Sequence, residues 1–196
     1  MRVFLAGEGP DDLGDWYHPP QYRKDPPQTG IIEALLRRVA AHDFTVIAAR
    51  PWKAIRKYRL RPPRRPEVQN VLGLMLEADE ARSDFLIFVR DQDGDTDRQA
   101  HIDEGLRLAR EGSFSPTPIG AVAIQEIEAW LLALLGERRS EQLSDPKTGL
   151  KERHGVADRP AKVAIVEGAS LDTLPDDARS LRTFLDEVLA SFVQGS

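Results

Sequence analysis

The chain contains no cysteine. This absence excludes disulfide bonds, thiolate metal ligands and thiol nucleophiles. Long apolar runs are also lacking, since no stretch approaches the roughly 20 apolar residues that a membrane-spanning helix needs. The apolar run after Met1 is too short for a secretion signal. We therefore expect a cytoplasmic protein with no membrane partner.

Several catalytic motifs are absent as well. The sequence has no Walker-type phosphate loop, so we do not expect nucleotide hydrolysis by that route. No serine stands in a G-x-S-x-G context. The four histidines are scattered, without the paired spacing of a metal site. The chemistry of the chain must therefore come from other residue types, chiefly its acids.

What the chain does have is the composition of a globular domain. Its 196 residues are 41% hydrophobic and 30% charged, which is enough apolar material for a core. Apolar runs that suit buried strands alternate with stretches of helical periodicity. We predict strands near 3–6, 44–49, 85–89 and 118–124, and helices near 31–42, 68–82, 96–110, 127–135 and 181–192.

This alternation is typical of βαβ units and a parallel sheet. We predict an α/β fold with a mainly parallel sheet of about four strands flanked by helices, over residues 1–135. Residues 136–196 are predicted to form a helical C-terminal extension packed on the same domain. Trp130 lies in the strongly apolar helix and is expected in the core.

The most informative segment is the apolar run 85–89, because three acids follow it at once. Asp91, Asp93 and Asp95 occupy every second position, so an extended backbone would aim all three the same way. Like charges held together are unfavourable unless a cation or a proton lies among them. Open α/β sheets place their sites at the carboxyl ends of strands. A divalent metal is therefore the first hypothesis.

Two other strand ends carry acids. Glu8 lies between two glycines after the first strand, and Glu126 and Glu128 lie where the fourth strand meets its helix. In a parallel sheet these ends share one edge, and carboxylate oxygens without soft ligands suit Mg²⁺ or Mn²⁺. The alternative is that such acids only cap helices or decorate the surface. That alternative explains Glu8 and the three aspartates poorly.

Two rival motifs can be compared with the aspartate segment. An EF-hand loop that began at Asp91 would need Gly and Glu where Thr96 and Ile102 stand, and it is excluded. A haloacid-dehalogenase-like phosphatase also places aspartates at the end of an apolar strand. Asp91 and Asp93 resemble that pattern, with Lys162 and the 176–177 aspartate pair as further candidates. This phosphatase is kept as a minority alternative.

One segment of the chain is strongly basic, although the net charge of the whole chain is −5. Residues 50–65 contain no acid, and Trp52 and Tyr58 are interleaved with the cations. Such a mixture suits phosphate contact and base stacking, and a solvated proline-rich loop is an equal alternative. The candidate nucleic-acid-binding residues are Arg50, Lys53, Arg56, Lys57, Arg59 and Arg61.

Three motifs together resemble a known family. They are Gly7-Glu8-Gly9-Pro10, Arg90 to Asp95, and Glu126 to Leu132. Their order and spacing resemble a bacterial family, domain of unknown function 4276, which is similar to the Toprim domains of topoisomerases, primases and overcoming-lysogenization-defect nucleases. The resemblance covers about residues 1–133, and 180–184 more weakly.

The resemblance implies a Toprim-like, Rossmann-like fold and a metal site. It implies that Asp91 and Asp93 hold Mg²⁺, that Glu8 is a ligand or a general acid or base, and that Glu128 is a further ligand or a supporting acid. Asp95 lies outside the Toprim pair and remains a candidate metal ligand. Two departures from the family pattern, Asp11 in place of threonine and Leu134 in place of an acid, put a complete two-metal site in doubt.

The sequence therefore predicts a Mg²⁺-dependent enzyme that acts on phosphodiesters, a nuclease or nuclease subunit of a defence or mobile-element system. Its partner would be DNA or RNA. The alternative is a non-catalytic subunit of a separately encoded ABC-type ATPase, since this chain has no such domain of its own. The apolar helix 127–135 or the last helix would then be the docking face. The oligomeric state is left open.

Overall fold

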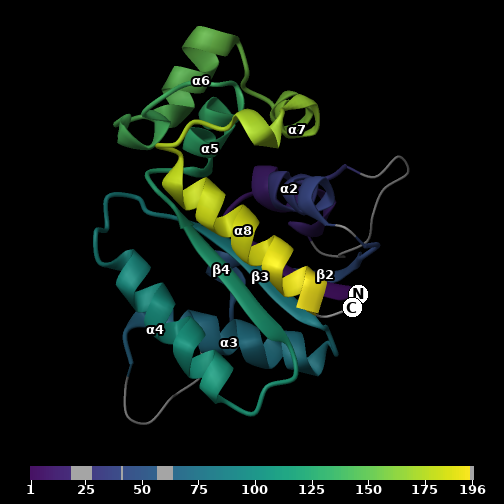
Figure 1. Ribbon diagram of the computed structural model, residues 1–196. Coiled ribbons are helices and arrows are strands. Elements are labelled where there is room, and N and C mark those ends of the chain that lie inside the picture. Colours follow the sequence, from purple (N-terminus) through teal and green to yellow (C-terminus); the bar gives the residue numbers. More distant parts are fainter. Residues whose placement is uncertain (19–27, 41, 57–63, 195–196) are drawn as a thin grey trace.

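The computed structural model describes residues 1–18, 28–40, 42–56 and 64–194. Four strands form one sheet in the order β2-β1-β3-β4, and every neighbouring pair is parallel. Helices flank the sheet, which confirms the predicted α/β class (Figure 1). The strands are β1 Arg2–Gly7, β2 Thr45–Pro51, β3 Phe85–Asp91 and β4 Thr117–Ala123.

The helices connect these strands and continue beyond them. Short 3₁₀ turns lie at Gly14–Trp16, Trp52–Ala54, Ser140–Gln142 and Leu171–Thr173. The α-helices of the described residues are α1 Pro10–Leu13, α2 Ile31–Val39, α3 Pro66–Glu80, α4 Arg98–Glu111, α5 Ile127–Leu134, α6 Pro146–His154, α7 Arg159–Gly168 and α8 Arg179–Gln194.

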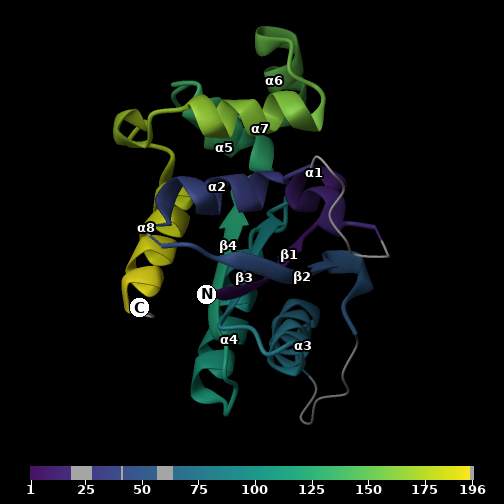
Figure 2. The same ribbon diagram turned by 90° about the vertical axis from the view of Figure 1, so that its right-hand side faces the viewer.

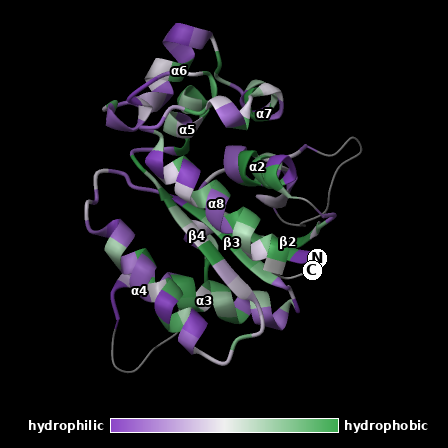
Figure 3. Ribbon diagram, in the orientation of Figure 1, coloured by the Kyte–Doolittle hydropathy of each residue, from purple (hydrophilic) through white to green (hydrophobic). Residues whose placement is uncertain are grey.

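The two faces of the sheet are covered by different helices, as Figure 2 shows. Because side chains alternate along a strand, Leu5 and Ile87 point to one face while Phe4 and Phe88 point to the other. The first face packs against α2, α5 and α8, and the second against α3 and α4. In Figure 3 the hydrophobic colour is concentrated on the strands and the helices beside them. Both faces are therefore buried, as a parallel sheet requires.

The C-terminal region contributes to the main core. Helix α8 packs on β4 and on α2, and its apolar side chains Phe184, Val188 and Phe192 are buried. Trp130 is fully buried and stacks on Phe184 at 5.3 Å between ring centroids, which confirms its predicted place in the core. Within the described residues, no helix has the length and apolar character needed to cross a membrane.

One expectation about partner docking is wrong. Every residue of α5, from Ile127 to Leu134, is buried, so this helix offers no docking face. The physical reason is its position between β3, β4, α6 and α7, where its apolar residues are covered on all sides. The last helix differs, because Leu189 and Val193 remain exposed on α8.

Candidate functional site

The carboxyl ends of β1 and β3 open into a cavity of about 370 Å³. Helices α1 and α5 begin at this edge of the sheet (Figure 2). The three acidic strand ends predicted from the sequence meet there. The lining is predominantly acidic and contains one exposed cation, Lys147. It consists of Glu8, Gly9, Pro10, Asp11, Asp12, Asp91, Asp93, Glu126, Ile127, Glu128 and Lys147.

A tight turn after β1 brings an additional acid into the cavity. Asp12 lies in the first turn of α1 and accepts hydrogen bonds from the backbone amides of Glu8 at 2.7 Å and Gly9 at 3.0 Å. Gly7 permits this turn, because a Cβ at Gly7 would lie 2.8 Å from the Cβ of Asp12. Any larger residue at position 7 would therefore push Asp12 away from the strand end.

Asp91 and Asp12 are acids that the fold leaves short of positive charge. Asp91 accepts a hydrogen bond from the amide of Ile127 at 2.9 Å, at the start of α5. Burial, followed by repulsion from Asp12 and Glu128, raises the pKa of Asp91 to about 8. Burial is also the largest cause that raises the pKa of Asp12 to about 7. Within the described residues, neither carboxylate forms an ion pair.

A buried lysine enters the same cluster from the C-terminal region. Lys162, on α7, is 2% exposed, and its ammonium group lies 2.8 Å from Glu128 and 2.5 Å from Asp11. These two carboxylates raise the pKa of Lys162 against the opposing effect of burial, so the amine is held charged. Residues 136–196 thus supply two lysines to the site, the buried Lys162 and the exposed Lys147.

Glu8 and its neighbour Asp93 are fixed by two arginines. Glu8 accepts a hydrogen bond from the amide of Asp91 at 2.8 Å, and its carboxylate pairs with Arg90. Asp93 pairs with Arg98 at 3.0 Å. Glu67, from the start of α3, lies against both guanidinium groups, at 3.4 Å from Arg90 and 3.2 Å from Arg98.

The loop after β3 is a turn and not a continued strand. Asp93 and Gly94 have φ angles of 49° and 72°, and Gln125 in the facing loop has a φ of 67°. The two loops are joined by a hydrogen bond from the amide of Asp93 to the carbonyl of Gln125 at 3.2 Å. Non-glycine residues in left-handed backbone gather at functional sites, where surrounding contacts hold them in place.

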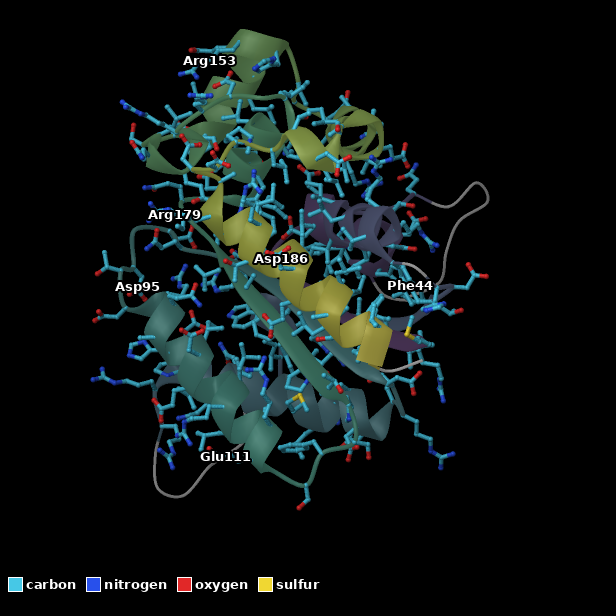
Figure 4. The ribbon with its side chains drawn as sticks, in the orientation of Figure 1. Phe44, Asp95, Glu111, Arg153, Arg179 and Asp186 are labelled. Carbon is cyan, nitrogen blue, oxygen red and sulfur yellow. The ribbon has the colours of Figure 1, made fainter. Side chains whose placement is uncertain are left out.

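This turn separates Asp95 from the cavity. The every-second-residue rule holds only for extended backbone, and the left-handed residues at 93 and 94 break it. Asp95 is exposed and accepts a hydrogen bond from the amide of Asp97 at 3.1 Å, so it caps its own turn. Figure 4 shows it at the outer loop ahead of α4. The structure therefore does not bring Asp95 to the other predicted ligands.

The described part of the basic segment is largely paired with acids of α3. Arg50 lies 2.5 Å from Glu77, and Arg56 lies 3.0 Å from Glu80. Lys53 is exposed. Trp52 is 7% exposed and packs on Phe88 at 5.5 Å, so the expectation that its ring stacks on a base is wrong. Three further candidates lie outside the described residues: Lys57, Arg59 and Arg61.

The residues suggested for a phosphatase are divided between two places. Lys162 contacts Asp11 and Glu128, two acids that line the acid cavity. Asp176 and Asp177 instead border a separate small pocket with Arg138 and Arg179, which shares no lining residue with the acid cavity. The aspartate pair can therefore take no part in chemistry at Asp91.

The acid cavity fits a hard divalent cation by its donor set. Three carboxylates each use one oxygen: those of Asp12 and Asp91 accept backbone amides, and that of Glu128 pairs with Lys162. The second oxygen of each has no partner among the described residues. Within those residues, no three acids or histidines already have the arrangement of a closed metal centre. An open site suits Mg²⁺, which usually keeps several of its waters.

Sequence reasoning missed Asp12 and the role of Lys162. Pro10 followed by two acids is a signal for a helix start, and it could have placed Asp12 beside Glu8. No local signal marks Lys162, because α7 is joined to the cavity only by the tertiary fold. The two arginines that pair with Glu8 and Asp93 carried no sequence signal either.

No family model, no curated protein and no solved structure matches the chain. The family resemblance of the sequence motifs is therefore neither supported nor contradicted.

Proposed function

We propose that the protein is a Mg²⁺- or Mn²⁺-dependent enzyme that hydrolyses phosphodiesters, a nuclease or the nuclease subunit of a larger system. One observation carries the proposal: acids from the ends of β1, β3 and β4 line a single cavity, and neither Asp12 nor Asp91 forms an ion pair among the described residues. A bound divalent cation would supply the missing charge. The Toprim resemblance of the same strand-end motifs supports the substrate class.

The residues divide into those that would hold the cation and those that orient them. Asp91, with Asp12 and Glu128, would hold it, and the backbone amides bonded to Asp12 and Asp91 fix the two aspartates. Glu8 and Asp93 line the same cavity, oriented by Arg90 and Arg98. When bound, the cation would neutralise charge on the phosphate and activate a water for attack.

Lys162 would have an electrostatic role at this site. It is held charged by two carboxylates, so it cannot accept a proton from the attacking water. It instead offsets part of the negative charge that would otherwise repel a phosphate. Outside the cavity, the exposed Lys53 is available for phosphate contact.

A phosphatase is the second candidate, favoured by one observation. A charged lysine behind strand-end aspartates would also offset negative charge on a phosphate monoester bound in the cavity. The two candidates differ in the substrate that is cleaved. Hydrolysis of a small chromogenic phosphate monoester, with no cleavage of DNA or RNA, would support the phosphatase.

The decisive experiment compares two aspartates of the same loop. Asp91→Asn and Asp95→Asn variants are incubated with plasmid DNA and with structured RNA in Mg²⁺ or Mn²⁺. We expect the Asp91→Asn variant to lose on the order of 10²-fold or more in rate, and the Asp95→Asn variant to keep the wild-type rate. Full cleavage by Asp91→Asn would contradict the proposal, as would the absence of metal-dependent cleavage by the wild type on either substrate and with either ion.

A further inference from the structure

A second groove lies away from the acid cavity, along the edge strand β4. It has a volume of about 300 Å³, and its walls are α4 on one side and α8 on the other. Figure 4 shows β4 running between these two helices, with Arg179 at the start of α8. The floor of the groove is the backbone of β4 itself, because β4 pairs only with β3 within the described residues.

The hydrogen bonds at both ends of β4 show which of its backbone groups face the groove. Thr117 donates to the Asp84 carbonyl at 2.9 Å, and Ala123 accepts from the Gln92 amide at 3.0 Å, so the odd-numbered residues face β3. Successive residues of a strand present their N–H and C=O groups to opposite edges. The even-numbered residues of β4 therefore face the groove.

At the two ends of β4, side chains form hydrogen bonds with the backbone groups that face the groove. Arg110 donates to the Pro118 carbonyl at 3.3 Å, and the Ile124 amide donates to the Ser180 hydroxyl at 3.4 Å. Between them, the N–H and C=O groups of Gly120 and Val122 have no partner within the described residues. Both residues are buried. Buried backbone polar groups are rarely left unpaired, so a ligand with main-chain donors and acceptors suits this floor.

The length of the groove limits which polypeptide segments could pair with β4. Arg110 and Glu187 form an ion pair of 2.5 Å that joins α4 to α8 at the Pro118 end of the groove. This clamp leaves room for about three extended residues at roughly 3.3 Å each. A second copy of this chain would bring the whole strand β4, which the clamp obstructs. A short segment of another protein fits the free edge.

The charge of the groove indicates one feature of that segment. Arg179 is exposed at the Ile124 end of the groove and forms no ion pair within the described residues. Asp176 and Asp177 border a separate pocket with Arg179 and do not line the groove. The acid on the opposite wall, Asp103, is already bonded to the Gln99 side chain at 2.8 Å. An acidic residue placed beside Arg179 would make a charge-assisted contact.

We propose that this groove binds a short extended peptide segment of a partner protein, which adds to β4 as a fifth strand and places an acidic side chain beside Arg179. Main-chain hydrogen bonds to Gly120 and Val122 would supply the affinity, as in other cases of strand addition. The proposal does not depend on the chemistry of the acid cavity.

The test uses a blocked tetrapeptide, acetyl-Val-Thr-Val-Asp-amide, and the full-length protein labelled with ¹⁵N. We expect millimolar peptide to shift the amide signals of Gly120 and Val122 and to slow their exchange with solvent. The same peptide N-methylated at alternate residues, so that its inward amides are lost, should bind at least about tenfold more weakly. Arg179→Glu should weaken binding about tenfold, and replacing the peptide aspartate by lysine should restore it.

Three results would overturn the proposal. The first is an absence of shifts at Gly120 and Val122 with millimolar peptide. The second is equal binding of the N-methylated peptide, which would show that main-chain bonds are not used. The third is a concentration-dependent shift of both amides in the protein alone, together with dimer formation in sedimentation, which would assign the edge to a second copy of this chain.

Discussion

Two places in this molecule, Glu77 on α3 and the acid cavity, neutralise their acids in different ways. Glu77, on α3, is 4% exposed, and its two oxygens receive the Arg50 side chain at 2.5 Å and the Arg56 amide at 3.0 Å. Asp91 and Asp12, at the acid cavity, receive only backbone amides, and burial raises the pKa of both. A buried acid with its own cation is part of the scaffold. A group of acids that shares one cavity and outnumbers its cations indicates a ligand that brings positive charge.

Among the substitutions that test this comparison, we expect Lys162→Met to cause the largest loss of unfolding free energy. Removing the ammonium group leaves Glu128 and Asp11 without a counter-charge in a cavity that is already too acidic. We expect the metal-free protein at pH 8 to lose about 3 kcal/mol of unfolding free energy, measured by urea denaturation. Lys147→Met is the matched control, because Lys147 lines the same cavity while exposed. Equal losses for both variants would contradict this account of Lys162.

Glu77→Gln tests the scaffold side of the comparison. The variant loses the charge that Arg50 and the Arg56 amide contact, so we expect a loss of about 2 kcal/mol. Because Glu77 belongs to no cation site, this loss should be the same with and without Mn²⁺. The exposed acid Glu80, which pairs with Arg56, gives the control, and Glu80→Gln should change stability by less than about 0.5 kcal/mol. If the loss of unfolding free energy in Glu77→Gln depended on Mn²⁺, Glu77 could no longer be distinguished from the acids of the cavity.

The pH dependence of stability should distinguish the two regions as well. The pKa values of Asp12 and Asp91 are raised in the folded protein, to about 7 and about 8, from an ordinary value of 3.8. Between these limits the folded state binds more protons than the unfolded state, so stability falls as the pH rises. We expect the metal-free protein to lose at least about 2 kcal/mol between pH 5 and pH 8.5 in urea titrations.

Asp91→Asn provides the internal control for that pH profile. The variant should show a shallower fall, because one of the two titrating groups is gone. Saturating Mn²⁺ should also offset the fall in the wild type, since the cation binds the charged carboxylates. A flat profile in the metal-free wild type would count against the raised pKa values and against the charge deficit of the cavity.

The smallest expected effect is that of Asp95→Asn. Its carboxylate caps an exposed turn, so we expect stability to change by less than about 1 kcal/mol and the Mn²⁺ affinity to stay within about twofold of the wild type. Asp12→Asn, at an acid that does line the cavity, should weaken Mn²⁺ binding by at least about tenfold. Calorimetric titration measures both. The reverse order of the two variants would return Asp95 to the ligand set.

The fold could be predicted because its signals are periodic. Apolar runs at 85–89 and 118–124 predicted the neighbouring strands β3 and β4, and helical spacing predicted α8, whose buried residues lie on one face. The convergence of Glu8, Asp91 and Glu128 also followed from topology, since the carboxyl ends of parallel strands share an edge. These inferences need only the local pattern and the rule for parallel sheets.

The rest of the site depended on turns and on tertiary contacts. Asp95 was grouped with Asp91 on the assumption of extended backbone, and the left-handed turn at Asp93 and Gly94 removed it. Lys162 reaches Glu128 across 34 positions of sequence, a contact that no local pattern encodes. Trp52 lies among cations in the sequence and was a candidate for base stacking, but its ring is buried because it packs on Phe88. Such errors arise where side-chain direction depends on residues distant in sequence.

The central claim is that the acid cavity is a divalent cation site, and a calorimetric titration with Mn²⁺ at pH 7.5 tests it most directly. Performed in two buffers of different ionisation enthalpy, it reports both binding and the protons released. We expect one or two saturable sites, proton release as Asp12 and Asp91 give up their protons, and binding at least about tenfold weaker in Asp91→Asn. No saturable binding, or equal affinity in wild type and Asp91→Asn, would contradict the claim.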